Sequence, residues 1–513
     1  MARRNTRLPK TFLRRLLIAF RIPIAIAVVI VGVFYYRGRK ADKLLRAQLA
    51  EYASRGEPVT ASDLQPPFVP DAFNAASDFI AAGKMVEADR ESPVSTEASS
   101  VDLLLPWTPE ESAKINAVLA KSGPVFDRVR AAEQKEGVDW GIAVTGPLMF
   151  LPLPLINSQR GLANRLAMGA LEAHVRGDDE VAVRRVRELL HVSRAIDRMP
   201  GGMVPHLVAN GCRGVVCSVV LQIASDLAID PGPGHDAARR QVASLIAELL
   251  NEKPMRDGLH NALWYYRASI VDTCDRILAG TLDANSLERA PTFVSKYVWM
   301  FLRAQFLTEA RLGVQYANDA ASTAYDATDL PMAQKNPNHF TDDVEQNPGR
   351  FGILAILYIS PCTRIVSLHF QNRTQSRATA IMLGLRLYSL DHGGKLPARL
   401  DDLVPAYLPG VPADPMASGG RPLRFIADET DPRIYSVGTN GTDEGGSEVP
   451  TKPLQYIEEP PDCWQREDAV FHFFRPVRLK RTAEQEAARI DDGGYRRRGR
   501  RSSVAAPPDP ETK

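Results

Sequence analysis

The loop Gly438–Gly446 groups three side chains whose oxygen atoms could do chemistry: Asn440, Asp443 and Glu444. Carboxylate and amide oxygens are the ligands that hard cations prefer, and backbone carbonyls of a flexible loop can add to them. Glycines at both ends of the loop let its backbone turn sharply. Two interpretations stay open: a cation site, and a plain Gly/Asn/Asp turn that binds nothing.

The remaining residues show no spacing typical of an enzyme. The chain has no HExxH, no phosphate-binding loop with its lysine, no dinucleotide fingerprint and no GxSxG elbow. Its nine histidines form no pair at i, i+3 or i, i+4. Asp178, Asp179 and Glu180 cluster at a predicted helix start, where carboxylates complement the helix dipole. We therefore expect no enzyme and no cofactor; the alternative is an active site assembled from dispersed residues of the helical region.

Composition is that of a folded protein, with 44% hydrophobic and 24% charged residues in 513. The net charge of +2 predicts no nucleic-acid partner. Five cysteines without a CxxC pair suit neither a zinc site nor a dense disulfide framework. The basic end of the chain, residues 476–513, is predicted to be disordered. Whether it binds an anionic surface or is only a solvated charge run stays open.

Residues 16–36, LLIAFRIPIAIAVVIVGVFYY, form an apolar run with one charge, Arg21. About 20 apolar residues span a hydrocarbon core of roughly 30 Å, so the run predicts a transmembrane helix. Seven basic residues lie before its apolar core and five just after it. This difference favours a cytoplasmic N-terminus, with the bulk of the chain outside the inner membrane. Because no small-residue cleavage site follows, we favour an uncleaved anchor over a removed signal peptide.

From Lys40 to Asp326 the apolar spacing is helical almost throughout. Thr108-Pro109-Glu110-Glu111 predicts a helix start with a capping box. Ser158–Arg198 predicts a helical hairpin that turns at Gly177-Asp178. Part of it resembles a single tetratricopeptide-type hairpin, and a generic antiparallel helix pair is the alternative because no 34-residue period recurs. Ser92–Ser100, rich in Ser and Glu, predicts a loop. Further helices are predicted over Val204–Ile229, His235–Asn251, Arg256–Ala279 and Pro291–Asp326.

A second apolar run, residues 351–370, contains Pro361 and Arg364 and is therefore costly as a membrane span. We interpret it as part of a buried spine helix. The alternative, a second crossing, would return the C-terminal domain to the cytoplasm. Residues 327–350, rich in Asn, Asp and Pro, predict a linker before this run.

The segment 377–446 contains four phrases in order: LYSLDHGGKLP, LDDLVPAYLPGVPADP, PLRFI and IYSVGTNGTDEGG. They predict a helix end, a short helix, and two facing strands that contain Phe425 and Tyr435, followed by the Gly-rich loop. This order resembles the globular domain of the major pseudopilins of bacterial type II secretion systems. The resemblance implies a small α+β domain with an antiparallel sheet.

In that family the corresponding loop binds calcium, so the resemblance implies that Asn440, Asp443 and Glu444 are ligands. Calcium takes about six to eight oxygens, yet the family's further acidic ligands have no clear equivalent at Glu448–Thr451. The prepilin-peptidase signature, a glycine followed by Phe-Thr-Leu-x-Glu, is also missing from both apolar runs. The chain is therefore not expected to assemble as a pilus subunit.

The expected fold is mainly α, with an N-terminal transmembrane helix, a helical middle region and a small pseudopilin-like α+β domain. The expected parts are a basic cytoplasmic N-terminus (1–15), the transmembrane helix (16–36), a helical domain (37–326), a linker (327–350), the pseudopilin-like domain (351–475) and the tail (476–513). The expected function is that of a membrane-anchored envelope scaffold that binds unknown protein partners in a secretion-related context. A calcium-stabilised binding module is the alternative.

Overall fold

The computed structural model describes residues 10–99, 101–229, 236–281, 296–334, 353–451 and 462–474. In this part the chain is mainly helical with one small three-stranded antiparallel sheet, so the expected fold class is confirmed at that level. The predicted tail 476–513 and residues 335–350 of the predicted linker lie outside the described residues.

The helices are α1 (Lys10–Ser54), α2 (Ala75–Asp89), α3 (Pro93–Ala98), α4 (Pro109–Leu119), α5 (Gly123–Ala132), α6 (Ile156–Val175), α7 (Asp179–Ile196), α8 (Met203–Ile223), α9 (Asp236–Leu250), α10 (Lys253–Ala279), α11 (Lys296–Asp326), α12 (Leu330–Gln334) and α14 (Ile353–Asp391).

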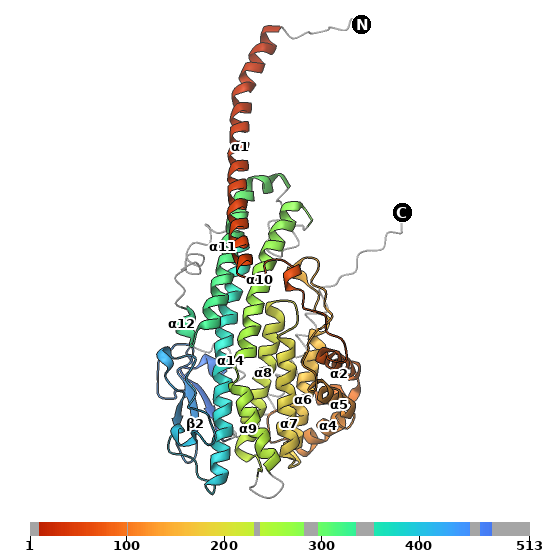
Figure 1. Ribbon diagram of the computed structural model, residues 1–513, viewed down its shortest axis with the longest axis vertical. Coiled ribbons are helices and arrows are strands. Elements are labelled where there is room, and N and C mark those ends of the chain that lie inside the picture. Colours follow the sequence, from red (N-terminus) through yellow and green to blue (C-terminus); the bar gives the residue numbers. More distant parts are fainter. Residues whose placement is uncertain are drawn as a thin grey trace, which may run out of the picture.

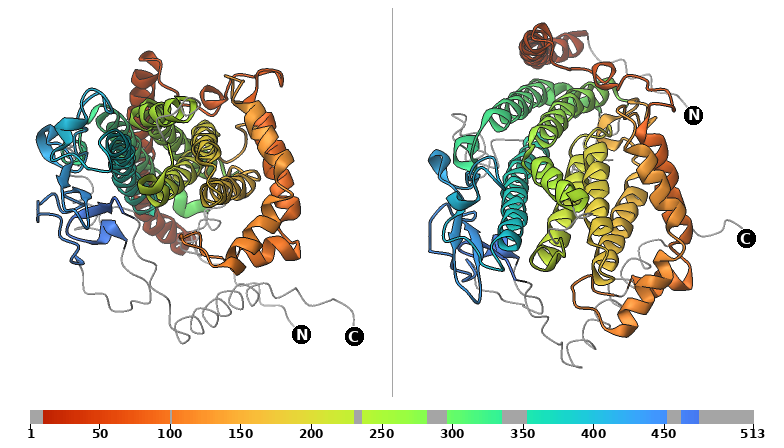
Figure 2. Two further views of the ribbon diagram at one scale, coloured as in Figure 1. Left: turned by 90° about the horizontal axis from the view of Figure 1, so that it is seen from below. Right: turned by 60° about the horizontal axis from the view of Figure 1, so that its bottom comes forward.

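The helices stand side by side in a row that crosses the molecule (Figure 1). α2 and α5 lie at one side, followed by α6, α7 and α8, and α14 carries the sheet at the other side. The views of Figure 2 agree that this helical row separates the sheet from α2 and α5. α1 projects from the upper end of the body, far beyond the other helices (Figure 1).

The two halves of α1 have different surroundings. Its side chains are described at Arg21 and from Pro23 onward. Ile24, Val28 and Val33 are exposed, although they are apolar. Further along, one face at i, i+4 and i+8 packs against α10 and α11 and is buried through Ala41, Leu45 and Leu49. The lower half of α1 is thus part of the protein core.

Local sequence signals account for several helix ends. Thr108 and Glu111 form the predicted capping box at the start of α4, which is confirmed. The predicted hairpin is confirmed as α6 and α7, with Gly177 at φ +85° and the Asp178 side chain accepting from Val181 N. The predicted loop at Ser92–Ser100 is wrong. Ser92 caps α3 and Pro93 starts it, because Ser and Pro are favourable at these two positions.

The long helix α14 is the spine on which the C-terminal part packs. Its residues Ile381 and Leu385 belong to one core cluster that also contains Leu162 of α6, Val216 of α8 and Ile434 of the sheet. The helical region and the C-terminal part therefore share a continuous core. The side chains of Cys362, Ile365 and Phe370 are buried as well, which favours a spine over a membrane crossing for this stretch.

One helix of the described part has the length and mean hydropathy of a membrane span: Met203–Asp226, which contains α8. Of its most apolar stretch, 61% is buried inside the protein. α8 packs against α6, α7, α10 and α14. This burial is typical of a core helix in a large helical body.

The sheet consists of β1 (Arg424–Ile426), β2 (Arg433–Ser436) and β3 (Ala469–His472), in the order β1-β2-β3. Phe425 pairs with Ile434, and Tyr435 pairs with Arg424, so the prediction that these two aromatic residues lie on facing strands is confirmed. β3 pairs with β2 from a later part of the chain. The predicted short helix is a 3-10 turn at Leu400–Leu403, whose two leucines are buried.

Candidate functional site

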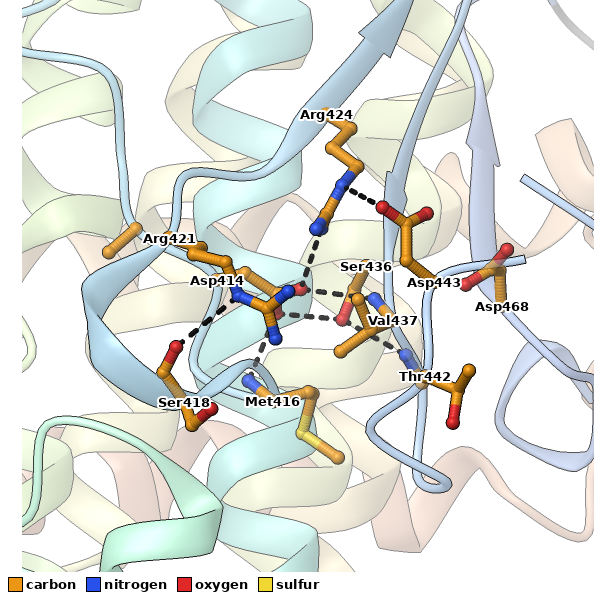
Figure 3. Close-up of polar contacts among 12 residues, drawn as sticks. Asp414, Met416, Ser418, Arg421, Arg424, Ser436, Val437, Thr442, Asp443 and Asp468 are labelled. Carbon is orange, nitrogen blue, oxygen red and sulfur yellow. Dashed lines mark hydrogen bonds and ion pairs between the residues drawn. The ribbon is translucent and has the colours of Figure 1, made fainter. Parts of the chain in front are cut away.

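The loop Gly438–Gly446 follows β2 and is held in place by a buried carboxylate, Asp414. Its Oδ1 accepts from Met416 N (2.9 Å) and Ser436 Oγ (2.8 Å), and its Oδ2 accepts from Val437 N (3.0 Å). Figure 3 shows these contacts converging where β2 passes into the loop. Burial raises the pKa of the Asp414 carboxyl, and the hydrogen bonds oppose this shift. Asp414 therefore fixes the direction in which the loop leaves the sheet.

All three predicted ligands have a contact within the loop or with a neighbouring cation. Asp443 Oδ2 lies 2.7 Å from Nε of Arg424, so this carboxylate forms an ion pair (Figure 3). Asn440 accepts from Thr442 N (3.0 Å) and donates through Nδ2 to Glu444 Oε1 (3.0 Å). These contacts are those of a self-supported Asx-type turn. The loop thus does not aim its three predicted side chains at one point.

Glu444 lies close enough to Asp468 for the charge of Asp468 to raise its pKa. The sequence indicated Glu444 but not Asp468. Asp468 lies just before β3, is fully buried, and accepts from Gly446 N (2.8 Å) and Ser447 N (3.0 Å) through Oδ2. Its Oδ1 and Glu444 Oε2 are buried without a hydrogen-bond partner among the described residues. Partial burial and the nearby charge of Asp468 raise the pKa of the Glu444 carboxyl. Two orphaned anionic oxygens favour a counter-charge at this place.

The described residues contain no group of three or more His, Cys, Asp or Glu side chains that could hold a metal ion. Asp468 was missed because it lies 24 residues beyond Glu444 and no local pattern marks it. Its only signal is its place directly before a strand-like run, Ala469–Phe471. Asp414 stood in the predicted phrase, but nothing in the phrase predicts its burial.

A second candidate region is a cavity of about 830 Å³ below the lower end of α1. It is lined by the chain after α1, by the segment between α7 and α8, and by one face of α10. Its carboxylates are already engaged. Glu57 pairs with Arg267 (2.5 Å), and Asp63 accepts from Val59 N (3.0 Å). Asp197 binds His206 and Arg213.

The Asp197–His206 pair beside this cavity resembles a catalytic dyad, but both imidazole nitrogens of His206 take part in hydrogen bonds. Arg213 Nη1 donates to Asn210 Oδ1 (2.8 Å), so the amide nitrogen of Asn210 donates to His206 Nε2 (3.0 Å). Nδ1 then carries the proton and donates it to Asp197 Oδ1 (2.8 Å). Both ring nitrogens are engaged, so the cluster joins α8 to the end of α7.

Comparisons with protein-family models, with curated proteins and with solved structures found no match. The two candidate regions of the chain differ: the carboxylates that line the cavity have partners, whereas Glu444 of the loop and Asp468 before β3 each keep one carboxylate oxygen without a hydrogen-bond partner among the described residues.

Proposed function

We propose that the protein is a membrane-anchored scaffold of the bacterial envelope. In this proposal α1 crosses the inner membrane once, its N-terminus is cytoplasmic, and the helical body stands outside and binds protein partners. The C-terminal lobe would contribute a pseudopilin-like binding module, with secretion as the context that the resemblance suggests.

One observation carries the proposal. The upper half of α1 stands clear of the body and exposes apolar side chains all around the helix: Ile24, Ile26, Val28, Val29, Ile30, Val31 and Val33. A helix that is apolar on every side needs an apolar environment. The lower half of the same helix is locked into the core, so a bilayer around the upper half would hold the whole body.

Reporter enzymes that are active only outside the cytoplasm, fused after Tyr52 and after Lys452, test this arrangement. Both fusions are expected to be active, because one crossing leaves everything beyond α1 outside. Full-length protein should also stay with the membrane pellet after an alkaline wash. An active reporter after Tyr52 with an inactive one after Lys452 would show a second crossing and contradict the single-span arrangement.

A calcium-stabilised lobe is a second candidate, favoured by the orphaned oxygens of Glu444 and Asp468. These two carboxylates, with carbonyls of the loop, are the residues that would hold the ion, while Asp443 remains on Arg424. A bound cation would supply the missing counter-charge. The fit is partial, because two carboxylates are fewer than the usual acidic set.

Thermal unfolding with calcium and with a chelator tests this candidate. Calcium is expected to raise Tm by about 2 °C or more, since ligand binding to the folded state stabilises it. The Glu444→Gln variant should lose this shift. In chelator it should be at least as stable as the parent, because it no longer repels Asp468. A Tm that is the same in calcium and chelator would eliminate the calcium site.

A further inference from the structure

α1 and α11 lie side by side and run in the same direction at the upper end of the body (Figure 1). Near the top, a Cβ added to Gly38 would lie 3.3 Å from Cδ of Arg303. Further down, Leu45 and Leu49 share a core cluster with Leu307 and Val314. The two helices therefore keep a common register as they descend into the body.

This register places the first turns of α11 at the end of the body where α1 emerges. The turn of α11 before Arg303 therefore lies at the same end of the body as the part of α1 before Gly38. The apolar run of α1 ends at Tyr36, only two residues before Gly38. If α1 spans a bilayer, the start of α11 lies at the level of the lipid headgroups.

The sequence at the start of α11 suits that environment. Tyr297-Val298-Trp299-Met300-Phe301-Leu302 is uninterrupted apolar and aromatic, with Lys296 before it and Arg303 after it. Tryptophan and tyrosine concentrate at membrane interfaces, because one part of each ring is apolar and another forms hydrogen bonds. Lysine and arginine residues that flank an apolar segment commonly bind anionic headgroups.

α1 carries matching interfacial residues at the same level. Tyr35 and Tyr36 are exposed, and Arg39 Nε donates to Tyr35 OH (3.0 Å) while its guanidinium lies over the Tyr35 ring. Arg37 and Lys40 are exposed as well. Aromatic and basic residues from two helices thus gather at one end of the body.

We propose that the first two turns of α11, Lys296–Leu302, form a second contact with the bilayer in its headgroup region. This inference rests on the proposed function, since it requires α1 to be inserted. A single span leaves a body free to tilt, whereas a second contact beside it sets the angle of the body to the membrane. The occupant of this surface is an anionic lipid bilayer, not a second copy of the chain.

Tryptophan quenching by brominated lipid tests the inference on the full chain in vesicles that contain anionic lipid. Trp299 is one of five tryptophans; the others are Trp107, Trp140, Trp264 and Trp464. We expect Trp299→Phe to remove at least about half of the lipid-quenchable fluorescence, because an interfacial indole lies within reach of the brominated chains. The matched variant Trp464→Phe, in the C-terminal lobe, should leave that component unchanged.

The outcomes separate this inference from the proposal on which it rests. If the protein floats with the vesicles and Trp299→Phe is quenched like the parent, the contact of α11 is refuted while α1 remains an anchor. Equal quenching together with a dimer in vesicles would assign the surface to a second copy and also refute it. If the protein does not float with the vesicles, the membrane anchor itself fails, and the inference with it.

Discussion

Replacing Arg267 by alanine is expected to lower the free energy of unfolding by about 3–5 kcal/mol, because removal of one partner leaves a desolvated ionic group without compensation. Arg267 is fully buried on α10. It donates to Glu57 (2.5 Å), to Pro58 O (2.7 Å) and to Asn318, and its guanidinium lies 4.7 Å from the centre of the Tyr52 ring. It therefore joins the chain just after α1 to both α10 and α11.

The measurement is chemical denaturation of the detergent-solubilised full chain, with proteolysis near Glu57 as a local readout. The matched control is Arg55→Ala, because Arg55 also pairs with Glu57 (3.1 Å) but is about half exposed. Exposed pairs contribute about 0–1 kcal/mol, so this variant should remain close to the parent. Equal losses in the two variants would show that Arg267 does not hold α1 to the body.

Acid is expected to destabilise the protein through His369, a fully buried residue of α14. Neither ring nitrogen has a hydrogen-bond partner among the described residues, and the ring stacks on His206 at 6.2 Å between centroids. Burial first, and then the nearby His206 and Arg373, hold the pKa of His369 well below its ordinary value of 6.5. The charges of Arg213 and Arg256 lower this pKa further. Protonation of the His369 ring would place a positive charge near these arginines.

The linkage between proton binding and folding determines how stability changes with pH. The unfolded chain binds the proton near pH 6.5, whereas the folded protein binds it only at lower pH, so stability falls as the pH drops below about 6.5. In this range, each pH unit of acidification should lower the free energy of unfolding of the parent by up to about 1.4 kcal/mol more than that of the His369→Leu variant. At pH 8 it should be at least as stable, because an unpartnered buried polar ring is costly. Unfolding curves between pH 5 and pH 8 measure both quantities. A slope that survives in His369→Leu would place the acid-sensitive group elsewhere.

Features set by neighbouring residues were predictable. The capping box at Thr108, the turn at Gly177-Asp178 and the apolar faces of α6 and α7 depend on contacts within a few positions along the chain. Such contacts have a strong periodic or positional signature. The prediction of a loop at Ser92–Ser100 was wrong because its serine and proline can equally start a short helix, and composition alone does not distinguish the two structures.

The candidate site was predictable only in part. The Gly-rich loop and its acidic residues were visible in the sequence, but their geometry depends on Arg424, which draws Asp443 away. Asp468, whose charge raises the pKa of Glu444, lies just before β3, and β3 pairs with β2 only in the folded chain. A carboxylate's role depends on which charges lie around it, and these come from distant segments.

By itself, the sequence determined the long apolar run near the start, the helical periodicity of the middle region and the glycine-rich loop after the second strand, because each is a property of consecutive residues. Only the tertiary structure decided which charges are buried together. Arg267 meets Glu57 across 210 positions, and His369 of α14 meets His206 of α8. Burial and long-range pairing arise when helices pack, and the energy of a buried charge is set by that packing rather than by its neighbours in the chain.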